Sequence, residues 1–157
     1  MQAKIGIEPA LLSKVAYELS RILADEFVLY TKTRNAHWNV EGPDFYSVHK
    51  FFEDQYEILD DTMDDIAERI RSIGHYAPAT LKEFLSLTKL TEESRSANSS
   101  GGFIKELLDD HETVIIHLRE NINRFANEYQ DAGTSDFITG LMETHEKMAW
   151  MLRSHLK

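Results

Sequence analysis

The fold of this 157-residue chain is decided by residues 45–74, FYSVHKFFEDQYEILDDTMDDIAERIRSIG. Apolar residues recur there every three or four positions, which is the spacing of a helix with one buried face. These residues are Phe45, Val48, Phe52, Tyr56, Leu59, Met63, Ile66, Ile70 and Ile73. The glycine that ends the run, Gly74, is typical of a helix stop. The stretch therefore predicts one long amphipathic helix that needs other helices to cover its apolar face.

Three more segments show the same period. A helix that begins near Pro9 ends before Gly42-Pro43-Asp44, a break that also offers Asp44 as the cap of the next helix. A third helix starts at Phe103, and Thr134 or Ser135 is expected to cap a fourth. No alternating strand pattern and no hairpin turn competes with these helices.

A long connection, residues 75–102, separates the second and third helices. Residues 79–87 in its middle are expected to form a short helix, and residues 94–102, rich in Ser, Asn and Gly, a flexible loop. Residues 1–8 form a short N-terminal lead. The chain is thus predicted to be a single domain, 1–157, with an all-α, ferritin-like four-helix bundle whose long crossover carries a short helix.

The composition excludes several classes of protein. Asp and Glu outnumber Lys and Arg by 27 to 17, and the net charge of −10 argues against a basic surface for nucleic acid. The chain has no Cys, which excludes disulfides and thiolate metal sites. No apolar run approaches the roughly 18 residues of a membrane span, and residues 1–10 do not look like a signal peptide. Histidine and carboxylate remain as metal ligands, a set that suits iron, manganese or zinc.

Four candidate ligands follow one edge of the apolar stripe in residues 45–74. They are His49, Glu53, Asp64 and Glu68. At about 100° per residue counted from Phe45, they fall at about 40°, 80°, 100° and 140°. The first two are spaced i,i+4, and so are the last two, so each pair is able to place two ligand atoms around one ion.

The two pairs cannot share an ion within one chain. His49 and Asp64 are 15 residues apart, so their Cα atoms lie about 22 Å apart along the helix, whereas metal–ligand bonds are about 2 Å long. A second copy packed antiparallel across a two-fold axis would bring the first pair of one chain opposite the second pair of the other. His37 is expected to return beside His49 through the turn at Gly42. The spacing therefore predicts a site shared by two subunits, with two imidazoles and three carboxylates that suit Fe(II) and leave room for a second ion.

Each of these residues also has an ordinary structural interpretation. Acidic residues of this stretch often form a solvated helix face, and a His beside an apolar stripe is often a boundary residue. Trp38 either fills a gap at a helix end or shields the metal site as a redox-active ring. The remaining histidines lack such a pattern and are expected to be structural: His75, His111, His117, His145 and His155. An intrasubunit di-iron centre of the Glu-x-x-His type is excluded, because no Glu has a His three residues later.

The chain also carries a series of short motifs that together resemble one protein family. They are spread over nearly the whole chain, from about Pro9 to Leu156. They are His37-Trp38-Asn39-Val40, Gly42, Phe45, Val48-His49, Glu53, Asp64, Ala67-Glu68-Arg69, Gly74, His145-Glu146-Lys147 and Trp150-Met151-Leu152. With these motifs the sequence resembles the Dps family, the miniferritins named as DNA-binding proteins from starved cells. The His-to-His and His-to-Asp spacings make the resemblance specific. Glu53 departs from the family's pattern, because that position is often Asp.

That resemblance implies an iron-storage and detoxification protein. Dps proteins are cytoplasmic, hollow dodecamers assembled from two-fold dimers. A ferroxidase site at each two-fold interface oxidises Fe(II), typically with hydrogen peroxide in preference to dioxygen, and ferric mineral is stored inside. The resemblance assigns the ligands of two Fe ions to both sides of that interface: His37, His49 and Glu53 of one subunit with Asp64 and Glu68 of its mate.

Iron entry and DNA binding are two further properties of the family. Iron enters through acidic pores, a role that the resemblance implies for Asp131 and Asp136, although a first-turn acid such as Asp136 is equally explained by the helix dipole. Members that bind DNA directly often carry a Lys/Arg-rich tail, whereas the ends of this chain hold only Lys4, Arg153 and Lys157. We expect weak or absent DNA binding and no membrane contact. The expected partners are identical subunits, in a homo-oligomer, and the oxidant, hydrogen peroxide or dioxygen. The alternative is a nucleoid-associated protein that compacts DNA and binds iron incidentally.

Overall fold

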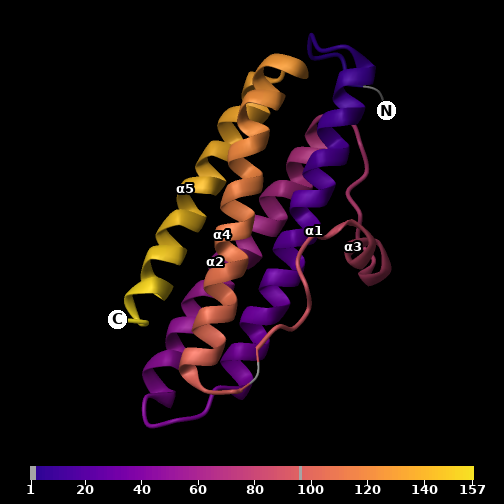
Figure 1. Cartoon of the computed structure of the whole chain (residues 1–157). Coiled ribbons are helices and arrows are strands. Elements are labelled where there is room, and N and C mark those ends of the chain that lie inside the picture. The colour runs from indigo at the N-terminus through magenta and orange to yellow at the C-terminus, as the bar shows by residue number, and fades with distance from the viewer. Residues whose placement is uncertain (1–2, 96) are drawn as a thin grey trace.

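Residues 3–95 and 97–157 are described by the structure, a computed structural model. Four long helices lie side by side, and a short one packs outside them against α1 (Figure 1). The helices are α1 (Pro9–Asn39), α2 (Phe45–Ser72), α3 (Leu81–Leu87), α4 (Ser100–Asn123) and α5 (Ala132–Ser154), with a π-helical turn η1 (Arg124–Glu128) after α4. The predicted all-α four-helix bundle with a short helix in its long crossover is confirmed.

A tight turn joins α1 to α2. Gly42 in this turn has a φ of 141°, a conformation that residues with a Cβ rarely adopt. Asp44 precedes the first residue of α2, as expected for a cap, but its side chain makes no capping bond. Asp44 Oδ1 instead accepts a hydrogen bond of 2.7 Å from Ser100 Oγ. The expected cap therefore ties the start of α2 to the start of α4.

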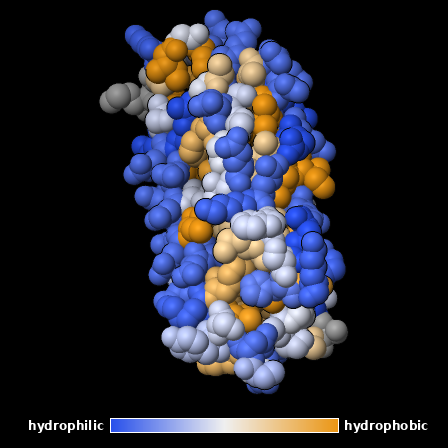
Figure 2. All heavy atoms as spheres, turned by 90° about the vertical axis from the view of Figure 1, so that its left-hand side faces the viewer, coloured by the Kyte–Doolittle hydropathy of each residue, from blue (hydrophilic) through white to orange (hydrophobic). Residues whose placement is uncertain are grey.

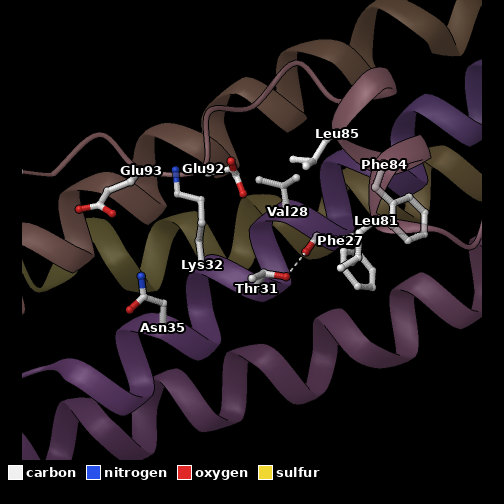
Figure 3. A pocket seen from close by; sticks show the side chains of 10 residues that line it. All are labelled: Phe27, Val28, Thr31, Lys32, Asn35, Leu81, Phe84, Leu85, Glu92 and Glu93. Atoms are coloured by element: carbon white, nitrogen blue, oxygen red, sulfur yellow. Dashed lines mark hydrogen bonds between the residues drawn. The ribbon is translucent and has the colours of Figure 1, made fainter.

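The crossover is anchored on α1 at several places, two of which lie at α3 and directly after it. Phe84 of α3 stacks on Phe27 of α1 with ring centroids 4.4 Å apart, and Figure 3 shows the two rings beside each other in a groove of about 560 Å³. Further along, the buried Asp25 accepts hydrogen bonds through Oδ1 from Thr88 Oγ1 and from the backbone N of Lys89, both at 2.7 Å. These contacts fix the crossover along one side of the bundle.

Residues 94–102 were expected to form a flexible loop, but the first residues of this stretch are anchored by hydrogen bonds and the last ones are helical. Glu106, whose side chain is 2% exposed, accepts hydrogen bonds from the backbone N of Ser94 and Arg95 and pairs with the Arg95 guanidinium at 3.1 Å. Helix α4 then begins at Ser100, so residues 100–102 are its first turn. The local composition gave no sign of the buried carboxylate in α4 that binds this segment. Ser96, and residues 1–2 of the lead, lie outside the described residues.

Helix α5 begins earlier than expected. Its N-cap is Asp131, whose Oδ1 accepts a hydrogen bond of 2.9 Å from the backbone N of Thr134. The prediction that Thr134 or Ser135 caps this helix is therefore wrong. A carboxylate suits the position, because the N-terminus of a helix carries partial positive charge. Arg69 near the end of α2 lies 3.3 Å from the same oxygen, so the cap also ties α5 to α2.

The interior is apolar apart from a few small groups of ionisable side chains. One of these groups lies in the centre of the bundle. Glu26 of α1, His111 of α4 and His145 of α5 are fully buried there. Glu26 Oε1 lies 2.7 Å from His145 Nε2, and the Nδ1 atoms of the two histidines share a hydrogen bond of 2.9 Å. Burial, and to a lesser extent the neighbouring His145, lower the pKa of His111 well below its ordinary value.

The outer surface agrees with the amphipathic pattern of the helices. Figure 2 shows the side on which α5 lies as mostly hydrophilic, with small separate apolar patches. Among the described residues, no helix is both long enough and apolar enough to cross a bilayer.

We predict that the free energy of unfolding decreases as the pH falls below about 6.5, and that His111 is a cause. The imidazole stays neutral in the folded chain but takes up a proton in the unfolded chain, so the unfolded state binds more protons in this range. The contribution approaches at most ~1.4 kcal/mol per pH unit. Chemical denaturation of the wild type and of His111→Leu, between about pH 7.5 and about pH 5, measures it.

The comparison of the two proteins separates the buried cluster around His111 from the other titrating groups of the chain. Burial raises the pKa of Asp110 to about 6, so Asp110 contributes with the opposite sign, stabilising the fold as the pH falls toward 4. Asp110 is present in both proteins, and its contribution cancels in the difference. The His111→Leu protein should show a flatter dependence on pH, and equal slopes would contradict the prediction.

Candidate metal centre

Two histidines lie against each other where α1 ends and α2 begins. His37 is in the last turn of α1, and His49 is in the second turn of α2. Their rings stack with centroids 3.7 Å apart and planes 20° apart. The turn through Gly42 therefore brings His37 back beside His49.

Reciprocal hydrogen bonds fix how both rings are oriented. His37 Nδ1 lies 2.9 Å from the carbonyl oxygen of His49, and His49 Nδ1 lies 2.7 Å from the carbonyl oxygen of His37. A carbonyl oxygen only accepts hydrogen bonds, so each Nδ1 has to carry the hydrogen. The Nε2 atom of each neutral ring is then left with a lone pair. Such a bond from Nδ1 to a carbonyl is the usual support of a metal-binding histidine.

A carboxylate completes a group of three ligand atoms. Glu53 lies one turn after His49 on α2, and one ligand atom from each of His37, His49 and Glu53 falls within 4.8 Å of the other two. All three side chains are half-buried. Two imidazole nitrogens and one carboxylate oxygen fit a divalent first-row metal such as Fe(II). The group is accordingly able to hold one such ion and leaves positions for further ligands.

Glu53 also makes an ion pair with Lys50, one turn before it on the same helix. The hydrogen bond from the Lys50 ammonium lowers the pKa of the Glu53 carboxyl below its ordinary value, and the charge of Lys50 acts in the same direction. Glu53 is therefore a carboxylate at neutral pH, as a metal ligand has to be.

Aromatic rings and a guanidinium surround the histidines. The ring of Phe45 stacks on His49 with centroids 5.0 Å apart, and Tyr56 meets His37 edge-on at 5.2 Å. Arg34 lies over the rings of Tyr56, at 4.2 Å, and Trp38, at 5.3 Å. Trp38, a candidate shield of the site, is 65% exposed. Tyr56 and Lys50 were not identified from the sequence as neighbours of the site. Both lie three residues from Glu53 on the same helix, and this spacing is a signal that could have identified them.

The second pair of candidate ligands lies elsewhere on the subunit. Asp64 and Glu68 are exposed on α2, which runs without a break from Phe45 to Ser72. Their distance from His49 is therefore the full helical rise, about 22 Å for Asp64. Among the described residues, neither Asp64 nor Glu68 belongs to the ligand group that contains His37. One subunit thus carries two separate parts of the predicted site.

The two candidate pore residues lie in different environments. Asp131 is 3% exposed, and its carboxylate is engaged by the backbone and hydroxyl of Thr134 and by Arg69. Asp136, in the next turn of α5, is exposed. Asp131 is therefore a helix cap, and of the two only Asp136 presents its carboxylate to solvent.

Comparisons with known proteins agree with this fold. The sequence pattern of the ferritin-like domain matches residues 17–157. An uncharacterized low temperature-induced protein of Nostoc sp. (strain PCC 7120), all0458, is 42% identical over 153 residues, which cover 98% of this chain and 86% of that protein. The DNA protection during starvation protein of Helicobacter pylori is 37% identical over 141 residues, 88% of this chain and 95% of the relative.

A solved structure extends the likeness to three dimensions. The Dps protein of Vibrio cholerae O1, described as a member of a broad superfamily of ferritin-like diiron-carboxylate proteins, superimposes with a TM-score of 0.92 at 28% identity. The match covers 99% of this chain and 97% of that one. Sequence and structure therefore agree that the chain belongs to the Dps family of the ferritin-like superfamily.

Proposed function

We propose that this chain is a ferroxidase, which oxidises Fe(II) at sites shared by two subunits and stores the ferric product inside a shell of identical subunits. The observation that carries the proposal is the pair of histidines with reciprocally bonded Nδ1 atoms beside Glu53. These residues offer two neutral nitrogen donors and one negative oxygen donor, a set suited to Fe(II). Membership of the Dps family, in which ferroxidase activity is typical, supports it.

A second subunit supplies the rest of each site in this proposal. The exposed Asp64 and Glu68 lie at the far end of α2 from the histidines. A two-fold axis across the middle of α2 would place them against His49 and Glu53 of the mate and would form two equal sites. Each site would then hold two imidazoles and three carboxylates, enough for two iron ions.

The reaction needs two iron ions because of its electron balance. Hydrogen peroxide takes up two electrons and two protons to become two molecules of water, and each Fe(II) supplies one electron. Two irons held together therefore reduce peroxide without release of a hydroxyl radical. The carboxylates offset the additional positive charge of the ferric product, and the neutral histidines keep the total charge of the site moderate.

We place this chemistry in a dodecameric shell in the cytoplasm, as the family's typical assembly and location imply. Relatives named for DNA protection during starvation support a role in the protection of DNA, which we place in oxidative stress. Removal of Fe(II) and peroxide protects DNA without contact, because both reactants of hydroxyl-radical formation are consumed.

We predict that Asp64→Asn lowers the rate of peroxide-dependent Fe(II) oxidation at least about tenfold, since loss of a supporting residue alone costs a metal site about 10–100-fold. Asp64 makes no ion pair or hydrogen bond among the residues that the structure describes, so the fold should be retained. Stopped-flow absorbance of the ferric product measures the rate. The matched control is Asp54→Asn, an exposed carboxylate on another side of the same helix, and equal rates in both variants would refute the proposed site.

We further predict that two strongly impaired variants restore part of the activity when their chains are mixed. His49→Asn keeps a hydrogen-bond donor near the position of Nδ1 but removes the ligand, and Asp64→Asn removes the other half of the site. In a mixed dimer, one site receives both intact residues and the other neither, so random mixing restores about a quarter of the sites. Co-refolded chains should then oxidise Fe(II) at about a quarter of the wild-type rate; no recovery would show that each site lies within one subunit.

We also propose that DNA is at most a weak partner. The chain has a net charge of −10, and of its terminal cations Arg153 is already paired with Glu112 at 2.7 Å. Binding to a duplex depends on neutralising phosphates and weakens steeply with salt. A gel-shift assay should show no retained complex at about 150 mM salt, and a complex that persists there would favour the alternative, DNA compaction as the main role.

A further inference from the structure

Among the described residues, Lys50 is the cation that forms an ion pair with the ligand group, and metal binding does not explain its presence there. It follows His49 directly, and its Nζ is paired with Oε2 of Glu53, one turn further along α2. Its side chain is 49% exposed and that of Glu53 27% exposed. Arg34, the other cation beside the histidines, is placed over the rings of Tyr56 and Trp38.

We infer that Lys50 is a positioning residue that competes with the metal ion for Glu53 and thereby lowers the affinity of a single subunit's half-site. This inference rests on the proposed function, because it assigns a role in the same site. Its basis is that one carboxylate lies in reach of both an ammonium group and the two histidine ligands. The ammonium is paired with Oε2 of that carboxylate, and a metal ion would bind the same carboxylate group.

The competition follows from charge and geometry. A divalent ion bound by His37, His49 and Glu53 would stand within a few ångströms of the Lys50 ammonium if the ion pair persisted. The repulsion of like charges at that distance is substantial near a protein surface. Lys50 therefore has to leave Glu53 when the ion binds, and its flexible, half-exposed side chain makes this movement possible.

The expected consequence is a moderate reduction of affinity. Exposed ion pairs are weak, because solvent screens them and ordering two side chains costs entropy. The half-site is thus weakened without being blocked, and tight binding requires the carboxylates of the partner subunit. Uptake of metal becomes coupled to formation of the shared site, and the return of Lys50 to Glu53 favours release of the ferric product.

The test measures binding of Zn²⁺, which is not oxidised, to the assembled protein by isothermal titration calorimetry. Lys50→Met keeps the length of the side chain and removes its charge, and it should bind Zn²⁺ about two- to fivefold more tightly than the wild type. Lys105→Met is the matched control. It removes the exposed ion pair with Asp109 on α4 and should leave the affinity unchanged.

A double-mutant cycle shows whether the effect acts through Glu53. In the background of Glu53→Gln, the change Lys50→Met should have little effect, since the shared carboxylate is gone. Equal affinity of Lys50→Met and the wild type, or an equal gain in both backgrounds, would overturn the inference while leaving the proposed function intact. Absence of Zn²⁺ binding to the wild type that depends on His37 would instead overturn both.

Discussion

A straight α-helix advances about 1.5 Å per residue, and this rise alone keeps the histidine end and the Asp64 end of α2 about 22 Å apart. The constraint holds only if the helix is unbroken and fixed at both ends. The structure meets both conditions. Helix α2 is continuous, the turn at Gly42 holds its start against α1, and the ion pair of Arg69 with Asp131 holds its end against α5. In the proposed dimer, a two-fold partner would therefore have a single register in which the histidine end of one α2 meets the Asp64 end of the other.

The acidic composition divides into two populations with different roles. Several carboxylates are buried and join parts of the chain that are distant in sequence, among them Asp25, Glu106 and Asp131. Others, including Asp64 and Glu68, are exposed along α2. The buried population stabilises the crossover and the helix ends. The surplus of negative charge is thus only partly available to attract cations.

The sequence predicted the features that depend on local periodicity, and it failed where a distant partner decides. The four long helices and the juxtaposition of His37 with His49 follow from repeats of three and four residues and from one glycine turn. The cap of α5 is Asp131 and not the predicted Thr134 or Ser135, and its carboxylate is also held by Arg69 of α2, a contact that the local turn sequence does not reveal. The order of residues 94–95 and the cluster of Glu26, His111 and His145 depend on contacts between helices that no spacing within one helix reveals.

The reciprocal bonds between the two histidines have a consequence for how such a site changes in evolution. Each ring uses Nδ1 to close the turn between α1 and α2, and in the proposed site it offers Nε2 to the metal. A substitution of either residue therefore removes a backbone anchor together with a ligand. Selection for folding alone would retain the pair even in a descendant that no longer encountered iron. Asp64 and Glu68 form no hydrogen bond or ion pair with the residues that the structure describes, and they would be free to drift. The two halves of one site are thus expected to be lost at different rates.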